Sequence, residues 1–339
     1  MQTQNLNDCF KQLWNLVGNT PMVEIHYLYK NRPGKVYAKL EYYNFSGSIK
    51  DRMALYILQE AYKNDKIKQG DLIIEATSGN TGIAFSAIGK ALGHNVKIIM
   101  PNWLSKERVD IIKSLGAEIQ LISKEDGGFL GSIALCEQAG NSCENVFLPQ
   151  QFDNENNVNA HFTTTGPEIA RQLATKNLVP DAVIAGVGTG GTIMGVGKYL
   201  RTINSKIQVH PLEPTESPTL TTGYKVGAHR MQGISDEFIP SIVKLNELDR
   251  VIAVNDGDAI IAAQKMAQQL GLAVGISSGG NIIGAIKLQQ ELGENAVVVT
   301  VVADDNKKYL STDLVKTEPE KENYISSELK FTHFFAFKI

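Results

Sequence analysis

Lys50 lies in a stretch that favours a reactive amine. The sequence FSGSIKDRMA, residues 45–54, places this lysine between a loop of small residues and a segment with the apolar spacing of a helix. A helix over residues 51–61 would put Lys50 at its positive end, where a charged ammonium is disfavoured. Burial in a cleft would lower the pKa of the Lys50 amine further, leaving the neutral form that a Schiff base requires. From this stretch alone, a solvated surface lysine is an equal alternative.

A glycine-rich loop is the strongest candidate for binding a phosphate. The stretch AGVGTGGTIMG, residues 185–195, follows a predicted strand and opens a predicted helix. Small residues at that junction let backbone N–H groups surround an anion at the amino end of a helix. Gly186, Gly188 and Gly191 also satisfy GxGxxG, and Glu213 ends the next predicted strand, so a dinucleotide site is an alternative. A third alternative is a tight turn without a ligand.

A second loop carries side chains suited to a carboxylate. The stretch EATSGNTGIAFSA, residues 75–87, again follows a strand and opens a helix. Hydroxyl, amide and backbone donors there could bind a substrate carboxylate at the helix amino terminus. These donors come from Thr77, Ser78, Asn80 and Thr81. A cluster of helix caps is the alternative, because Ser, Thr and Asn are preferred caps.

A third loop, VGISSGGNIIGA at residues 274–285, is interpreted as a strand that ends in serines before a helix. Capping of that helix is the simpler interpretation of these serines when the loop is taken alone. A function for them depends on the other loops.

The elements around these loops alternate between strand and helix. Strands are predicted at residues 72–75, 96–100 and 117–122, and helices at residues 106–115 and 128–139, with Gly116 as a left-handed helix stop. This order predicts a parallel sheet with crossover helices over residues 70–150. A second α/β series follows, with helices beginning near Pro167 and at residues 190–200 and 258–270, and strands at residues 181–187, 206–213, 250–255 and 295–302. The aromatic segment 331–339 is strand-prone, and it either packs on the body or contacts another subunit.

The composition narrows the class of function. The chain has 339 residues, 43% hydrophobic and 20% charged, which is enough for two domains. A net charge of −3 and a pI near 6.1 give no basic field for nucleic acid or an anionic membrane. The amino terminus has no basic-then-apolar signal, and no apolar run approaches the ~18 residues of a membrane span. These features predict a cytoplasmic protein that acts on small molecules.

The three cysteines, Cys9, Cys136 and Cys143, form no CxxC pair. Their odd number and spacing argue against a disulfide framework or a structural zinc site, and no metal site is expected.

Taken together, the loops resemble one family. The chain is similar to the β-family, or fold type II, pyridoxal-phosphate enzymes, and within it to the cysteine synthase (O-acetylserine sulfhydrylase) and cystathionine β-synthase family. The resemblance covers residues 14–312. It is carried by VGNTPMV, SGSIKDR, EATSGNTGIA, SLGAEIQLI, PQQFDNENN, TTGPEIA, GVGTGGTIMGVG, GISSGG and KKYLST, in that order. One departure is ADDNKKY, residues 303–309, where relatives commonly carry Ser-Gly.

The resemblance implies an α/β fold with two three-layer αβα domains and pyridoxal 5'-phosphate in the cleft between them. A larger cofactor-anchoring domain is expected over residues 1–47 and 157–316. A smaller mobile domain with the substrate loop is expected over residues 48–156, and a C-terminal tail over residues 317–339.

The resemblance also implies site residues. Lys50 would bind the cofactor covalently and then move the substrate's Cα proton, and Asn80 would hydrogen-bond the ring's phenolic oxygen. Ser277 would meet the pyridine nitrogen, with the adjacent Ser278 as the alternative. The phosphate would be held by Gly188, Thr189, Gly190, Gly191 and Thr192. The substrate carboxylate would be held by Thr77, Ser78, Asn80, Thr81 and Gln151.

The implied reaction is β-replacement through an α-aminoacrylate, with formation of cysteine from O-acetylserine and sulfide as the first candidate. A neutral serine opposite the pyridine nitrogen makes the cofactor a weaker electron sink, which suits elimination better than transamination. Asp236 and Glu237 put acidic groups where cysteine synthases carry small residues, and Asp236 could activate a second substrate. A salt bridge is the alternative role for these carboxylates.

The second substrate therefore stays open among several possibilities. Formation of cystathionine or lanthionine from serine or cysteine, and release of hydrogen sulfide from cysteine, are the alternatives to cysteine synthesis. An NAD-binding oxidoreductase or a silent binding protein is the alternative of a different class. The resemblance further implies a homodimer and a possible serine acetyltransferase partner.

Overall fold

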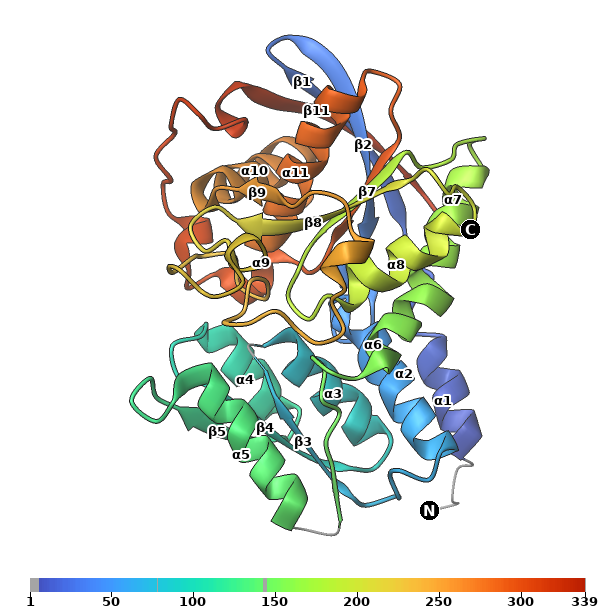
Figure 1. Ribbon diagram of the computed structural model, residues 1–339, viewed down its shortest axis with the longest axis vertical. Helices are drawn as coiled ribbons and strands as arrows, with labels where there is room; N and C mark the ends of the chain where they lie inside the picture. The colour runs from blue at the N-terminus through green and yellow to red at the C-terminus, as the bar shows by residue number, and fades with distance from the viewer. Residues whose placement is uncertain (1–5, 78, 143–144, 339) are drawn as a thin grey trace.

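The chain folds around two separate β-sheets, shown one above the other in Figure 1. The structure is a computed structural model and describes residues 6–77, 79–142 and 145–338. Among these residues no helix has the length and apolar character needed to cross a membrane. The α/β class predicted from the alternating pattern is confirmed.

The smaller sheet is wholly parallel and has the strand order β5-β4-β3-β6. Its strands are β3 (Leu72–Ala76), β4 (Asn95–Pro101), β5 (Glu118–Ile122) and β6 (Val146–Phe147). Helices α2 (Lys50–Lys63) and α3 (Asn80–Ala91) pack on one face, and α5 (Gly128–Ser142) packs on the other. Gly116 follows the end of α4 (Lys106–Ser114). Its φ of +73° is left-handed, as the sequence predicted for a helix stop. The result is the predicted three-layer unit with crossover helices.

The larger sheet is mixed and has the strand order β11-β1-β2-β10-β7-β8-β9. Its strands are β1 (Met22–Tyr29), β2 (Arg32–Leu40), β7 (Ala182–Gly186), β8 (Gln208–Pro214), β9 (Ile252–Val254), β10 (Val298–Val302) and β11 (Leu329–Phe337). Strand β1 runs antiparallel to both of its neighbours, β11 and β2, and the other pairs of the sheet are parallel. The remaining α-helices are α1 (Leu6–Trp14), α6 (Glu155–Ala160), α7 (Gly166–Ala174), α8 (Gly191–Arg201), α9 (Thr219–Thr222), α10 (Asp256–Leu270) and α11 (Ile276–Leu292).

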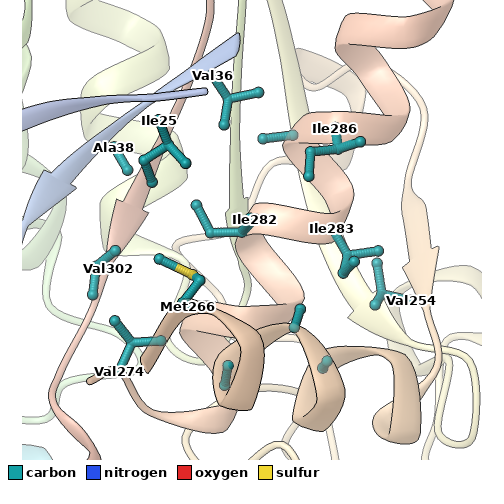
Figure 2. Close-up of a cluster of buried hydrophobic side chains, with 14 of the residues drawn as sticks. Ile25, Val36, Ala38, Val254, Met266, Val274, Ile282, Ile283, Ile286 and Val302 are labelled. Atoms are coloured by element: carbon teal, nitrogen blue, oxygen red, sulfur yellow. The ribbon is translucent and has the colours of Figure 1, made fainter. Parts of the chain in front are cut away.

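Apolar layers hold the helices to both faces of the larger sheet. Figure 2 shows one layer, in which Ile282 and Ile286 of α11 lie towards Ile25 and Val36 of the β1–β2 hairpin, and Ile283 lies beside Val254. These side chains are fully buried, and burying each one contributes about 2 kcal/mol. On the opposite face, side chains of α7 and α8 pack on β7, β8 and β10. This sandwich fixes the carboxyl ends of the parallel strands, where the loops of interest begin.

The structure corrects one predicted element and adds others. Residues 274–277 do not form the predicted strand, because α11 already begins at Ile276 and Val274 makes only an isolated bridge to Asp305. The hairpin of β1 and β2 was not predicted from the sequence. The aromatic tail forms β11 and pairs with β1, so it packs on the body of its own chain.

The predicted domain boundaries stay a prediction. The two sheets divide the chain between β3–β6 and the other strands. The amino-terminal helix α1, however, places Phe10 and Leu13 in the apolar cluster of α2 and α3.

Candidate active site

Loops from both sheets meet at one cavity, called here the cleft cavity. It lies at the carboxyl ends of the parallel strands β3, β7 and β10, where ligands bind in open α/β sheets. Its walls include Lys50, Thr77, Asn80, Thr81, Gln151, Gly186, Thr189, Thr192, Asp236 and Ser277. Residues singled out in three separate loops of the sequence are therefore brought together in space.

Lys50 is the first residue of α2 and lines the cleft cavity. Burial lowers the pKa of its amine, while the carboxylates of Asp304 and Asp236 oppose that shift. Beside it, Asp51 is fully buried and accepts hydrogen bonds from the Ser46 N–H at 2.7 Å and hydroxyl at 2.5 Å. An acidic residue in the first turn stabilises the positive end of the helix. Ser46 and Asp51 therefore stabilise the start of α2, and the Lys50 side chain is not needed for this.

A buried ion cluster anchors the same helix. Arg52 donates to Glu41 from Nε at 2.6 Å and to Glu168 from Nη1 at 2.8 Å, and Lys39 lies 2.8 Å from Glu168. The side chains of Arg52 and Lys39 are fully buried. Burial alone would raise the pKa of the Glu168 carboxyl, but Arg52 and Lys39 hold it well below its usual range. The cluster ties α2 to β2 and α7, and it was not identified from the sequence.

The glycine-rich loop turns into α8 with little free space. Gly190, the residue before α8, has a φ of +87°, in the left-handed region that favours glycine, and no side chain caps the helix. A Cβ on Gly188 would lie 2.3 Å from the Gly233 carbonyl oxygen, and one on Gly191 would lie 2.0 Å from Asn157 Oδ1. The Gly191 N–H donates to the Thr189 hydroxyl only at a long 3.5 Å, so the amino end of α8 could still hold an anion.

The carboxylate loop is braced by Gln151. The Thr81 hydroxyl donates to Gln151 Oε1 at 2.6 Å, and Gln151 Nε2 donates to the Ala76 carbonyl at 2.8 Å. The Thr77 hydroxyl accepts from the Gly79 N–H at 3.0 Å. Ser78, which the sequence also predicted here, lies outside the described residues. Burial raises the pKa of Glu75, directly before this loop, to about 8.

Two adjacent serines at the start of α11 occupy different environments. Ser277 lines the cleft cavity, whereas Ser278 is fully buried and its hydroxyl oxygen accepts from the Ala303 N–H at 3.0 Å. Ser277 is therefore the serine that faces the cavity.

Asp236 reaches the cleft cavity from the loop after α9. Burial raises the pKa of its carboxyl to about 6, even though the nearby Lys50 charge lowers it. Its neighbour Glu237 instead pairs with Lys225 at 2.9 Å. The salt-bridge alternative thus describes Glu237, while Asp236 faces the cavity.

Some residues of the site were missed in the sequence. Arg108 and Gln232 line the cavity and hydrogen-bond to each other, and the Asn157 amide joins Gln151 to Thr189. The motif PQQFDNENN contains Asn157, so that asparagine could have been proposed. For Arg108 the local sequence gave no signal beyond helical spacing.

The structure argues against the dinucleotide alternative, because its acidic residue is already engaged in hydrogen bonds. Glu213 is 2% exposed, and its carboxylate accepts hydrogen bonds from the Leu220 N–H at 2.7 Å and from the Thr221 hydroxyl. A ribose would need that carboxylate free.

The donors of the cleft cavity fit pyridoxal phosphate. An amine with a lowered pKa suits an aldehyde, and the uncapped amino end of α8 suits a phosphate. Asn80 Oδ1 is buried with no hydrogen-bond partner among the described residues, as expected of a polar group awaiting a ligand.

Comparisons with known proteins agree with this fit. A family model described as "Pyridoxal-phosphate dependent enzyme" matches residues 13–304. The chain is 41% identical over 300 residues to a probable cysteine synthase of Bacillus subtilis (strain 168), covering 88% of this chain and 96% of that protein. A hydrogen sulfide-producing enzyme from Fusobacterium nucleatum has a TM-score of 0.96 and 51% identity, covering 98% of this chain and 100% of that one. A cysteine synthase from Entamoeba histolytica has a TM-score of 0.83 and 33% identity, covering 97% and 96%. The chain therefore belongs to the family of pyridoxal-phosphate-dependent enzymes and has the fold type II architecture that its motifs predicted.

Proposed function

We propose that the protein catalyses β-replacement on an amino acid of the serine or cysteine type. Pyridoxal phosphate, when bound, supplies an electron-withdrawing ring that acidifies the Cα–H of the amino acid. The observation that carries the proposal is the shared cavity, which holds one amine, Lys50, and one carboxylate of raised pKa, Asp236, beside the carboxylate loop.

Each residue has a role that its position supports. Lys50 holds the cofactor aldehyde and, once released, takes the Cα proton. The residues Gly188, Thr189, Gly190, Gly191 and Thr192 hold the phosphate, Ser277 meets the ring nitrogen and Asn80 meets the phenolic oxygen. The residues Thr77, Ser78, Asn80, Thr81 and Gln151 bind the substrate carboxylate and exclude water as the cleft closes.

Asp236 favours hydrogen sulfide release from cysteine as the overall reaction. In this reaction the Cβ–S bond of cysteine breaks, the thiol leaves as hydrogen sulfide, and water or a second thiol forms the new bond at Cβ. Asp236 accepts the proton of the incoming water or thiol, which its pKa of about 6 allows at neutral pH. The 51% identical relative is named as a hydrogen sulfide-producing enzyme, which supports the same choice.

Cysteine synthesis from O-acetylserine and sulfide is the second candidate. This candidate is supported by the Bacillus relative, which is named a probable cysteine synthase, and by the Entamoeba relative, which is named a cysteine synthase. It requires no base for the nucleophile, because a substantial share of hydrogen sulfide is already present as HS⁻ at neutral pH. Lanthionine and cystathionine formation use the same cavity with a larger thiol.

One experiment separates these candidates. The purified protein is mixed in turn with cysteine, serine and O-acetylserine while the cofactor absorbance is followed, and sulfide release and products are measured by mass spectrometry. Rapid sulfide release from cysteine supports the first candidate. A response to O-acetylserine alone, with cysteine formed on adding sulfide, supports the second, and no response to any donor contradicts β-replacement.

Assembly and location are part of the proposal. A homodimer and a serine acetyltransferase partner are expected from the sequence resemblance, and a cytoplasmic location is expected from the composition of the chain. Light scattering of the purified protein, alone and mixed with the acetyltransferase, tests the first two.

A further inference from the structure

Asp304 lies beside the cleft cavity and was not predicted as a site residue. It follows Ala303, which lines the cavity just past the end of β10, and it is fully buried. The Ile49 N–H, next to Lys50, donates to the Ala303 carbonyl at 2.9 Å, and the Gly275 N–H donates to the Asp304 carbonyl at 3.1 Å. The backbone of Asp304 is thus held between the segment that carries Lys50 and the segment that leads to Ser277.

The side chain of Asp304 joins the two halves of the molecule. Its Oδ2 accepts from Asn80 Nδ2 at 2.8 Å and from the Tyr309 hydroxyl at 2.7 Å. Asn80 begins α3 on the smaller sheet, 224 residues away in the chain. The Tyr309 oxygen in turn accepts from Arg108 Nη2 of α4 at 2.8 Å. One carboxylate oxygen therefore binds, directly or through Tyr309, two helices of the smaller sheet.

This contact fixes which way the Asn80 amide faces. A carboxylate can only accept hydrogen bonds, so Asn80 must present its NH₂ group to Asp304. Its Oδ1 then points elsewhere, and it has no hydrogen-bond partner among the described residues. The second N–H of the same amide also stays available. Asn80 would bind a ligand through these two groups, its Oδ1 and its second N–H.

The surroundings are shaped to accept the Asp304 carboxylate. A Cβ on Gly275 would lie 2.2 Å from Asp304 Oδ1, so no other residue fits at position 275 without displacing the carboxylate. The Asp304 carboxylate opposes the burial that lowers the pKa of the Lys50 and Lys308 amines. Its Oδ1 is buried without a hydrogen-bond partner among the described residues, so this carboxylate is costly to bury.

We propose that Asp304 is a positioning residue that orients the Asn80 side chain for the cofactor and holds the smaller sheet against the larger one. The proposal rests on the proposed function, because it takes Asn80 as a ligand of the cofactor.

A double-mutant cycle tests the proposal through cofactor affinity. Apoprotein of the wild type and of Asn80→Ala, Asp304→Ala and the double variant is titrated with pyridoxal phosphate. We expect about 10-fold weaker binding for each single variant, the scale of one lost charge-assisted hydrogen bond, and no further loss beyond about 3-fold in the double variant. Losses that multiply in the double variant would overturn the proposal.

Two further variants serve as a rescue and a control for the cycle. Asp304→Asn keeps an acceptor oxygen in the Oδ2 position and should restore affinity to within about 3-fold of the wild type, so a loss as large as that of alanine would contradict orientation by this contact. Asp305→Asn, a matched charge removal one residue along, should leave affinity unchanged. Asp305 is partly exposed and pairs with Lys307 at 3.4 Å. If Asp304→Ala does not fold, Asp304→Ser takes its place in the cycle.

Cofactor binding by the wild type and hydrogen exchange without cofactor separate the role of Asp304 from the proposed function. If the wild-type protein binds pyridoxal phosphate but the losses in the double variant multiply, only the role of Asp304 is contradicted. Wild-type protein that does not bind it contradicts the proposed function. Hydrogen exchange of the unliganded variants then decides, because Asp304→Ala should raise exchange at residues 79–83 about 10-fold over Asp305→Asn, and equal exchange would overturn the positioning role.

Discussion

The Thr81 hydroxyl donates a 2.6 Å hydrogen bond to the Gln151 side-chain oxygen, joining α3 to the loop after β6 across 70 residues of sequence. The Gln151 N–H also donates to Glu75 at 3.3 Å, and its amide donates to the Ala76 carbonyl at 2.8 Å. Gln151 therefore binds the carboxyl end of β3 at two points and the first turn of α3 at a third. This clamp gives the carboxylate loop a defined shape before a substrate arrives.

Loss of the clamp should affect the substrate more than the cofactor. We expect Thr81→Ala and Gln151→Ala to raise the KM for the amino acid about 10- to 100-fold, because the loop loses a buried hydrogen bond, with cofactor content near that of the wild type. Thr163→Ala serves as control, since the exposed Thr163 hydroxyl donates to the Asn159 and Ala160 carbonyls of its own helical segment. Equal loss of cofactor in both variants would contradict the assigned roles.

Asp236 should give the reaction with cysteine a pH dependence. The carboxylate is the active form, and burial raises its pKa to about 6, so sulfide release should increase as the pH rises through about 6. Asp236→Asn should lose that inflection and release sulfide about 100-fold more slowly. The measurement is the sulfide release rate against pH for both proteins. An asparagine variant with the wild-type rate and profile would assign the base to another group.

The glycine-rich loop should not tolerate a methyl group. In Gly191→Ala the new Cβ would meet Asn157 Oδ1 at 2.0 Å, which displaces either the loop or the asparagine that links Gln151 and Thr189. We expect at least about 10-fold weaker binding of pyridoxal phosphate in an apoprotein titration, with thermal unfolding measured alongside. Unchanged affinity would show that this loop does not hold the phosphate.

The buried ion cluster should govern stability at low pH. Arg52→Leu leaves the buried Glu41 carboxylate without its ion-pair partner and Glu168 with Lys39 alone, and it should lower the free energy of unfolding by about 3–5 kcal/mol. Lys106→Ala, which breaks the exposed pair with Asp110, should have little effect. Denaturant unfolding of the two variants measures the difference.

The same cluster sets the direction of the pH effect. Burial would raise the pKa of Glu41 and Glu168, but their pairing with Arg52 lowers both pKa values below the ordinary 4.5. Their contribution to stability is therefore present above about pH 4.5 and is lost as the pH falls below it. The Arg52→Leu protein should lack this part of the acid dependence, and an unchanged acid profile would contradict the ion-pair account.

The sequence predicted well wherever a pattern is local. The strands β3, β4 and β5 and the helices α4, α5 and α10 are found within a few residues of their predicted ends, because each buries one apolar face with a regular period. The hairpin of β1 and β2 was missed because its apolar residues do not stand apart from the charged residues around them, and its pairing with β10 joins distant parts of the chain.

Site residues could be predicted where a loop is rich in small polar residues. They could not be predicted where their role depends on contacts between distant parts of the chain. Lys50, Asn80, Thr189 and Ser277 come from loops rich in small polar residues, and all of them line the cleft cavity. Arg52 and Asp304 lie in stretches that were singled out, but their partners are 116 and 224 residues away, so the local sequence did not predict their contacts. The strand predicted before Ser277 was wrong because tertiary packing starts α11 earlier than the local residues suggest.

The central claim is that the Lys50 amine carries the cofactor, and borohydride reduction of the purified protein tests it most directly. The reduced protein is digested and its peptides are mapped by mass spectrometry, with Lys50→Ala as the control. We predict a phosphopyridoxyl group on Lys50 and loss of the cofactor's visible absorbance in the alanine variant. A phosphopyridoxyl group on another lysine, or none on wild-type protein saturated with pyridoxal phosphate, would contradict the account.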